Sequence, residues 1–269
     1  MENQATQRAE IHRTIWKIAN DLRGAVDGWD FKQYVLDMLF YRYISEHLDN
    51  RISQEEGSDY ASMADSEIDE EAKDGIVDDY GYFITPSHLF KNVLATARSN
   101  EDLNETLEQA FKGIEASTVG HDSNEDFQGL FQDLDLNSAK LGTTPGEKHD
   151  RLASIMEAVG SLNLGTTLDQ ASVDTFGDAY EYLMGMYASN AGKSGGEYFT
   201  PQCVSELLAQ IAVPDSQETR SIYDPACGSG SLLLRAAKRA DIRHVQIYGQ
   251  EKNLTTYNLC RMNMMLHNV

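Results

Sequence analysis

Residues 221–234 read Ser-Ile-Tyr-Asp-Pro-Ala-Cys-Gly-Ser-Gly-Ser-Leu-Leu-Leu, and this stretch decides the fold. A short apolar strand ends in Asp224, a tight turn of small residues follows, and a helix then runs through Ala237. In such units a ligand lies at the carboxyl end of the strand, where glycines let it approach the backbone. The pattern therefore predicts a ligand site at the turn, made by Gly228, Ser229, Gly230 and Ser231.

A second strand is expected within residues 244–251, His-Val-Gln-Ile-Tyr-Gly-Gln-Glu, which end in another acid. Glu251 lies 21 residues after Gly230. A carboxylate at about this offset from the glycine turn meets the ribose hydroxyls in strand–helix–strand nucleotide sites. We therefore expect Glu251 to bind a ribose.

The turn also indicates which nucleoside it suits. Leu233 stands where a dinucleotide site would have its third glycine, and the Gly-Lys-Ser/Thr of a phosphate-binding loop is missing. Asp224 would repel a pyrophosphate and attract an ammonium group. S-adenosylmethionine, with its ribose, adenine and amino-acid end, fits both acids. A different nucleotide-binding fold, with NAD or ATP as ligand, is an alternative.

Upstream of the first strand, a loop rich in glycine and serine, residues 189–196, precedes a predicted helix. Thr200 and Pro201 suit the cap and first position of that helix, which carries Val204, Leu207, Leu208 and Ile211. A helix N-terminus beside small residues offers free backbone N–H groups to an anion. An ordinary capped helix is the alternative.

The first part of the chain differs in character from the second. Residues 1–165 hold 32 acidic and 14 basic residues, whereas residues 166–269 hold 11 and 8. Apolar residues at helical spacing recur through the first part, so we expect a helical domain over 1–165 that packs or docks. The acid-rich run from Glu46 to Asp79 is expected to be a solvated helix end and loop.

Composition excludes several classes of protein. Three cysteines without a C-x-x-C pair support neither a disulfide framework nor a zinc site, and no metal ligands are assigned. No stretch reaches about 18 consecutive apolar residues, and the N-terminus lacks an apolar signal core, which indicates a cytoplasmic protein without membrane contact. A net charge of −21 should prevent tight DNA binding by the chain alone.

Three motifs together resemble one family. They are Gly-Gly-Glu-Tyr-Phe-Thr-Pro (195–201), Asp-Pro-Ala-Cys-Gly-Ser-Gly-Ser (224–231) and Tyr-Gly-Gln-Glu (248–251). The last is followed by Asn253, Thr256, Met262, Asn263 and Met264. With the opening segment 15–24 and Phe40, Tyr43 and Ile44, they are similar to the modification subunit of type I restriction–modification systems, an adenine-N6 DNA methyltransferase.

The resemblance implies an α plus α/β protein: an N-terminal helical bundle, then, over residues 166–269, the first part of a Rossmann-like S-adenosylmethionine-dependent methyltransferase domain. It implies a specificity subunit, a restriction subunit and a second modification subunit as partners, with DNA bound only through the assembled complex. The implied cofactor-binding residues are Glu197, Tyr198, Phe199, Thr200, Pro201 and Gln202 on one side, and Asp224, the glycine turn and Glu251 on the other.

The family's catalytic loop is Asn/Asp-Pro-Pro-aromatic, which holds a flipped adenine. Prolines occur here only at 86, 145, 201, 214 and 225, so no Pro-Pro exists and no catalytic residue is assigned. We expect a truncated domain that is inactive alone. The apolar residues Leu259, Met262, Met265 and Leu266 are then expected to lack a neighbour. A non-catalytic partner-binding module with a vestigial nucleotide site is the alternative.

Overall fold

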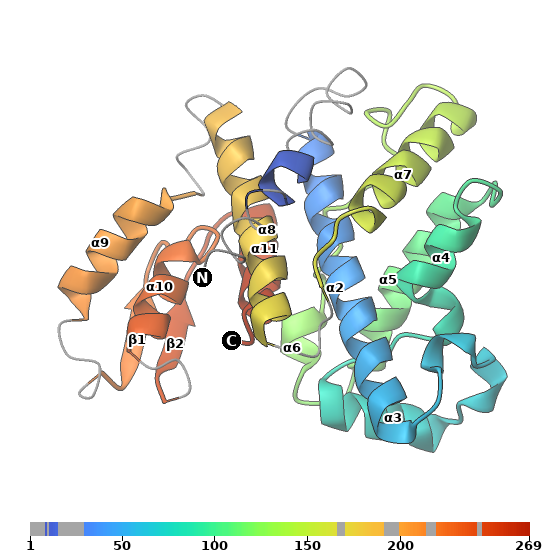
Figure 1. Cartoon of the computed structure of the whole chain (residues 1–269), viewed down its shortest axis with the longest axis horizontal. Helices are drawn as coiled ribbons and strands as arrows, with labels where there is room; N and C mark the ends of the chain where they lie inside the picture. The colour runs from blue at the N-terminus through green and yellow to red at the C-terminus, as the bar shows by residue number, and fades with distance from the viewer. Residues whose placement is uncertain are drawn as a thin grey trace. The chain divides into compact units, whose positions relative to one another are not determined.

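The computed structural model describes residues 9, 11–15, 30–165, 170–190, 199–213, 219–240 and 244–269. The chain divides into two compact units, Met1–Thr175 and Phe176–Val269, and each is described by itself (Figure 1). None of the helices in the described parts of the chain is long and apolar enough to cross a membrane.

The elements of the first unit are helical. In chain order they are α2 (Asp30–Glu56), the 3-10 turns η1 (Tyr60–Ser62) and η2 (Asp65–Glu67), α3 (Glu70–Tyr80), the 3-10 turn η3 (Pro86–His88), α4 (Phe90–Thr96), α5 (Leu103–Ser117), α6 (Asn124–Phe127) and α7 (Pro145–Gly160).

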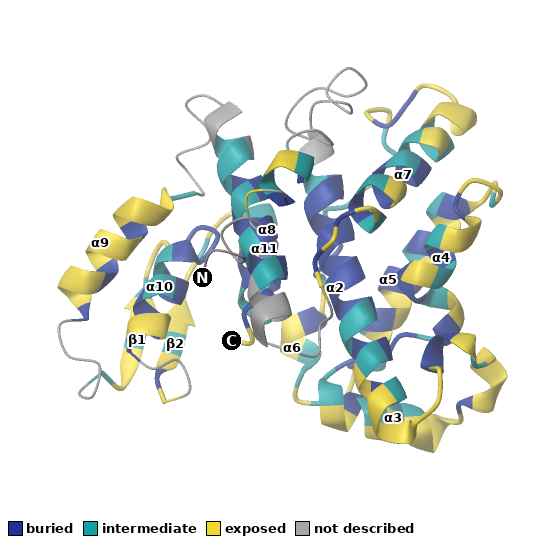
Figure 2. Ribbon diagram, in the orientation of Figure 1, coloured by how far each residue is buried: buried dark blue, intermediate teal, exposed yellow. Residues whose placement is uncertain are grey.

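Helix α2 is the centre of the first unit. Residues 34–45 are all buried, because α4 and α7 pack against this helix (Figure 2). Arg42 extends from α2 to the end of α7, where its Nη1 donates to the carbonyls of Val159 at 2.7 Å and Leu162 at 2.9 Å. The last carbonyls of a helix have no partner within the helix. The Val159 carbonyl also accepts from the Leu162 N–H at 3.2 Å, and Arg42 adds a side-chain donor at the end of α7.

Helix α7 begins with a capping box. The Thr144 hydroxyl accepts from the Glu147 backbone N–H at 3.2 Å, and the Glu147 carboxylate accepts from the Thr144 N–H at 3.2 Å. These backbone and hydroxyl donors hold the pKa of Glu147 below its ordinary value, with the Thr143 N–H as the largest cause. Pro145 occupies the first helical position, where its fixed backbone angle suits a helix. The N-terminus of α7 is therefore specified by residues close together in the sequence.

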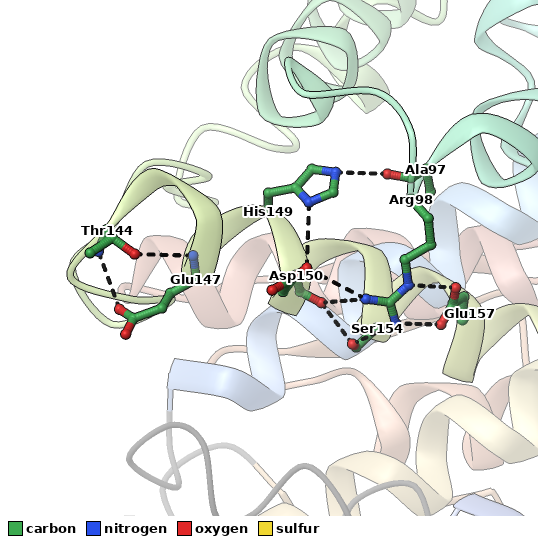
Figure 3. Close-up of polar contacts among 8 residues, drawn as sticks. All are labelled: Ala97, Arg98, Thr144, Glu147, His149, Asp150, Ser154 and Glu157. Carbon is green, nitrogen blue, oxygen red and sulfur yellow. Dashed lines mark hydrogen bonds and ion pairs between the residues drawn. The ribbon is translucent and has the colours of Figure 1, made fainter.

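A surface cluster joins the end of α4 to α7 (Figure 3). The Arg98 guanidinium donates to both carboxylate oxygens of Glu157, at 2.7 and 2.6 Å, and to the Ser154 hydroxyl at 2.9 Å. His149 Nε2 lies 2.9 Å from the carbonyl of Ala97. Because Arg98 and Glu157 are about half exposed, water screens the pair, which orients the two helices more than it stabilises them.

The acid-rich run from Glu46 to Asp79 contains the end of α2, η1, η2 and most of α3. Apart from Glu46 and Asp49, its acidic residues are exposed, which confirms the expected solvation, but residues 70–79 belong to helix α3 and not to a loop. Asp69 caps α3 by accepting from the Ala72 N–H at 2.9 Å, and two further acids occupy the first turn of α3, where they complement the helix dipole.

Asp37 is a buried acid in the middle of α2. Burial, reinforced by the nearby charge of Asp133, raises its pKa well above the ordinary value, although the side-chain amide of Gln33 donates to it at 2.9 Å. A carboxyl whose folded-state pKa is raised stabilises the fold below its unfolded-state pKa, and that contribution is lost as the pH rises through the folded-state value.

We therefore predict that the free energy of unfolding of the first unit falls as the pH rises from about 4 toward neutrality, and that Asp37→Asn removes much of this fall. Denaturant titrations across that pH range measure it. The exposed Asp122→Asn is the matched control. A variant at Asp37 with an unchanged pH profile would contradict the prediction.

The second unit contains a small parallel sheet. Its elements are α8 (Gln170–Asn190, which begins in the first unit), α9 (Gln202–Ala212), β1 (Ser221–Asp224), α10 (Ser231–Arg239), β2 (Gln246–Gly249) and α11 (Leu254–Leu266). β1 and β2 pair in parallel, with Ser221 opposite Gln246 and Asp224 opposite Gly249. The predicted strand–helix–strand order is confirmed, with β2 two residues shorter at each end.

The sheet has one covered face. Ile222 and Ile247 are partly buried against α9, α10 and Cys227, Leu233 and Cys260, whereas Tyr223 and Tyr248, on the opposite face, are 59% and 52% exposed. Successive side chains of a strand point to opposite faces, so helices on one side bury every second residue.

The expectation that Leu259, Met262, Met265 and Leu266 would lack a neighbour is wrong. Leu259, Met262 and Leu266 are buried, and Met265 is partly buried. Tyr180 of α8 shows why: its hydroxyl lies 3.5 Å from the Leu259 carbonyl and 3.7 Å from Met262 Sδ. A helix about eighty residues earlier in the chain therefore covers α11.

The start of helix α9 differs from its prediction. The helix begins at Gln202, so Pro201 occupies the cap position and Thr200 precedes it, because Pro201 has extended backbone angles and its carbonyl accepts from the Val204 and Ser205 N–H groups. Its small residues Ser205 and Ala209 are buried. Its larger apolar residues are exposed (Figure 2), namely Val204, Leu207, Leu208 and Ile211.

Candidate functional site

Backbone hydrogen bonds join the segments that follow the two strands. The Gln250 N–H donates to the Asp224 carbonyl at 2.9 Å, and the Cys227 N–H donates to the Gln250 carbonyl at 3.0 Å. These bonds extend the parallel ladder past the ends of β1 and β2. As a result, the glycine turn after β1 and Glu251 after β2 lie at the same edge of the sheet.

The turn after β1 adopts a left-handed backbone at two positions, and both positions are glycines. Gly228 has φ +57° and Gly230 has φ +80°, a left-handed conformation that other residues adopt with strain. The Gly230 N–H donates to the Cys227 carbonyl at 2.9 Å, which closes the turn, and α10 begins at Ser231. A helix N-terminus therefore starts directly at the predicted turn.

Close packing against α11 also fixes the conformation of the turn. A Cβ atom on Gly230 would clash with Met264 Cε and lie 2.8 Å from Cys260 Sγ, both on α11. The Asn263 side-chain amide, on the same helix, donates to the Ser229 carbonyl at 2.9 Å. Ser229 and Ser231 are buried, with their hydroxyl oxygens 3.2 Å apart.

The two acids at the strand ends are held but remain partly accessible to solvent. Asp224 Oδ1 accepts from the Ala226 N–H at 2.9 Å, and Glu251 Oε1 accepts from the Asn253 N–H at 2.8 Å. Asn253 in turn caps α11 by accepting from the Thr256 N–H at 3.0 Å. Each carboxylate is oriented by one backbone donor, which restricts its rotamer at the edge of the sheet.

The upstream motif is described from Phe199 onward, and Glu197 and Tyr198 lie outside the described residues. Phe199 and Thr200 are partly buried, whereas Pro201 and Gln202 are exposed. The Gln202 amide donates to Glu181 Oε2 on α8 at 2.8 Å, and the same oxygen accepts from Arg235 of α10 at 2.7 Å. Glu181 thus connects this motif to the helix that follows the glycine turn.

Cys227 and Cys260 form a buried thiol pair beside the turn. Their sulfur atoms are 3.9 Å apart, compared with about 2.05 Å in a disulfide, and both cysteines are free. The hydrogen bond between them lowers the pKa of Cys227 and raises that of Cys260. Both cysteines pack with Leu233 and Met264 beside the turn.

Comparison with known proteins identifies the family. Residues 11–159 match the family described as HsdM N-terminal domain, and residues 171–269 match N-6 DNA Methylase. The chain belongs to the methylase-subunit family of type I restriction enzymes. The resemblance inferred from the sequence is therefore confirmed.

Individual relatives cover almost the whole chain. The type I restriction enzyme MpnII methylase subunit of Mycoplasma pneumoniae is 46% identical over 284 residues, covering 100% of this chain and 52% of the relative. The MjaIX methylase subunit of Methanocaldococcus jannaschii is 24% identical over 277 residues, covering 96% and 45%. The chain thus spans about half the length of these curated relatives.

A solved structure agrees with the family. The type I restriction-modification system methyltransferase subunit from Streptococcus thermophilus superposes with a TM-score of 0.82 at 32% identity, covering 97% of this chain and 56% of that one. The fold of helices with a small parallel sheet is therefore that of a type I methyltransferase subunit.

The sequence did not indicate two residues that the structure connects to the predicted motifs, Glu181 and Arg235. They are 54 residues apart and belong to no motif. One feature could have drawn attention to Glu181: it is an acid beside the apolar face of α8, next to Tyr180 and near Leu183 and Met184, all of which are buried. Buried acids are uncommon unless they are paired.

We predict that Gly230→Ala destabilises the second unit by about 1–3 kcal/mol, because the new Cβ would force left-handed strain and the clash with Met264. Hydrogen exchange of the α10 and α11 amides measures this free energy. Gly113→Ala, in open space within α5, is the control and should be neutral or slightly stabilising. Unchanged exchange in the Gly230 variant would contradict the prediction.

Proposed function

We propose that this chain is the cofactor-binding part of a DNA adenine-N6 methyltransferase subunit, with S-adenosylmethionine as its cofactor. Residues 166–269 would form the first part of a Rossmann-like methyltransferase domain, and residues 1–165 the helical domain that docks onto partner subunits. The observation that carries the proposal is the meeting of the glycine turn, Asp224 and Glu251 at one edge of the parallel sheet.

The residues at this edge suit the proposed cofactor chemically. A carboxylate accepts hydrogen bonds only, and a ribose offers two hydroxyl donors, so Glu251 matches a ribose. The side-chain carbonyl oxygen of Asn263 is buried beside the turn and has no hydrogen-bond partner. It therefore leaves an acceptor beside the turn that a ligand donor could use. Asp224 suits a cationic ligand group and disfavours a pyrophosphate.

Each group of residues would then have a role. Glu251 would bind and orient the ribose through the carboxylate that Asn253 holds in place. The backbone of the glycine turn, at Gly228, Ser229, Gly230 and Ser231, would let the ligand approach closely, and Asp224 would face the amino-acid end. The segment Glu197–Gln202 would enclose the opposite side. When bound, the cofactor supplies a methyl group on a sulfonium centre.

Further components belong to the same proposal. The family resemblance supports assembly with a specificity subunit, a restriction subunit and a second modification subunit in the cytoplasm. DNA would be bound only through that assembly, because the charge of −21 repels phosphates. Methyl transfer would need an Asn/Asp-Pro-Pro-aromatic loop to hold the adenine, and these 269 residues contain no Pro-Pro.

Isothermal titration of the chain with S-adenosylmethionine tests cofactor binding. We expect saturable heat in the wild-type chain and at least about tenfold weaker binding in Glu251→Ala and in Asp224→Ala, since each loses a charged acceptor. Glu206→Ala, an exposed acid on α9, is the matched control and should bind as the wild type does. No binding to the wild-type chain, or tighter binding of NAD or ATP, would contradict the proposal.

A second test concerns the chain by itself. Incubation with methyl-labelled S-adenosylmethionine and DNA should leave adenine unlabelled, and a band-shift assay at physiological salt should show no DNA complex. The reasons are the missing Pro-Pro sequence and the net charge. Label on adenine, or a clear shifted band with the purified chain, would overturn this part.

A further inference from the structure

Helix α8 contacts the first residue of α9 and the segment just before it, at two positions one helical turn apart. Glu181 accepts from the Gln202 side chain, and Gly185 lies against Phe199, since a Cβ atom there would be 2.9 Å from Phe199 Cζ. Residues four apart share a helix face, so one face of α8 supports both ends of the segment 199–202.

The Glu181 carboxylate is almost fully buried, at 1% exposed. Its Oε2 accepts from Gln202 at 2.8 Å and from Arg235 at 2.7 Å. Arg235 lies on α10, five residues after Gly230. One oxygen atom thus links the upstream motif with the helix that begins at the glycine turn.

Stability alone does not explain why the Glu181 carboxylate is buried here. Taking an ion pair out of water costs about as much as the pair regains, and apolar replacements of such pairs are often neutral or stabilising. Glu181 Oε1 is moreover buried without a hydrogen-bond partner, which adds to the cost. The carboxylate instead fixes the orientation of the Gln202 side chain relative to α10, because one oxygen accepts from both Gln202 and Arg235.

We propose that Glu181 is a positioning residue of the cofactor site. Arg235 holds the Glu181 carboxylate in place, and Glu181 holds Gln202 and thereby the segment 199–202 against α8, with Gly185 leaving room for the Phe199 ring. The segment 199–202 is thereby held in position to contact a cofactor bound at the glycine turn. This inference rests on the proposed binding of S-adenosylmethionine, but Glu181 acts through Gln202 and does not touch the cofactor.

The test compares three variants of the whole chain by titration with S-adenosylmethionine. Glu181→Met keeps the side-chain length but removes the acceptor, so binding should weaken about tenfold. Glu181→Gln keeps an acceptor oxygen and should bind within about twofold of the wild type. Glu206→Met is the matched control on the exposed side of α9 and should bind normally.

A second readout needs no cofactor. Hydrogen exchange of the peptide that contains residues 199–205 should be faster in Glu181→Met than in the wild type and in Glu181→Gln. Peptides from α10 and α11 should keep their protection. If Glu181→Met does not fold, Gln202→Ala removes the same hydrogen bond from the exposed side, and it should give the same faster exchange.

The outcomes separate the two proposals. A wild-type chain that does not bind S-adenosylmethionine contradicts the proposed function, while exchange at 199–205 still decides whether Glu181 positions the segment. Unchanged exchange there in both Glu181→Met and Gln202→Ala overturns the inference. So does an equal loss of binding in Glu181→Gln and Glu181→Met, because charge rather than the hydrogen bond would then be responsible.

Discussion

The parallel pairing of β1 and β2 is the constraint on which the second unit depends. Because the two strands are in register, and because Gln250 bonds to both Asp224 and Cys227, the chain leaves both strands at the same edge. Two acids that are 27 residues apart in sequence therefore come to the same edge of the sheet as the left-handed glycine turn. A slip of the register by one residue would turn the side chains of β2 to the opposite face and separate the two acids.

Packing behind the turn transmits this constraint to the helices. Gly230 leaves the space that Met264 and Cys260 of α11 occupy, and the Asn263 amide binds the Ser229 carbonyl. α8 then covers α11 through Tyr180. The shape of the turn and the position of α11 are thus determined together, so substitutions on the face of α11 behind the turn should alter the turn.

Much of this arrangement could be predicted because it is local. The turn, α10 and β2 follow from a continuous stretch in which strand, small residues and helix succeed one another, and the position of Glu251 follows from its distance along the chain. The acid-rich run of the first unit was predictable for the same reason. Such patterns predict structure that forms between residues close together in the sequence.

The rest depends on contacts between distant residues. Nothing in the sequence relates Glu181 to Arg235 or Gln202, and the burial of Leu259 and Met262 depends on α8, so the sequence alone led to the wrong expectation for that face. The start of α9 was misplaced by one residue because Pro201 suits the first position of a helix as well as the cap that it occupies. Long-range packing decides the first two, whereas the start of α9 depends on the local backbone of Pro201.

A crystal structure of the chain with S-adenosylhomocysteine would show whether the edge of the sheet at Asp224 and Glu251 binds the cofactor. We expect the ribose hydroxyls within hydrogen-bonding distance of the Glu251 carboxylate, and the amino-acid end of the ligand beside Asp224 and the glycine turn. An ordered ligand elsewhere on the chain, or a ribose that Glu251 does not contact, would contradict this expectation.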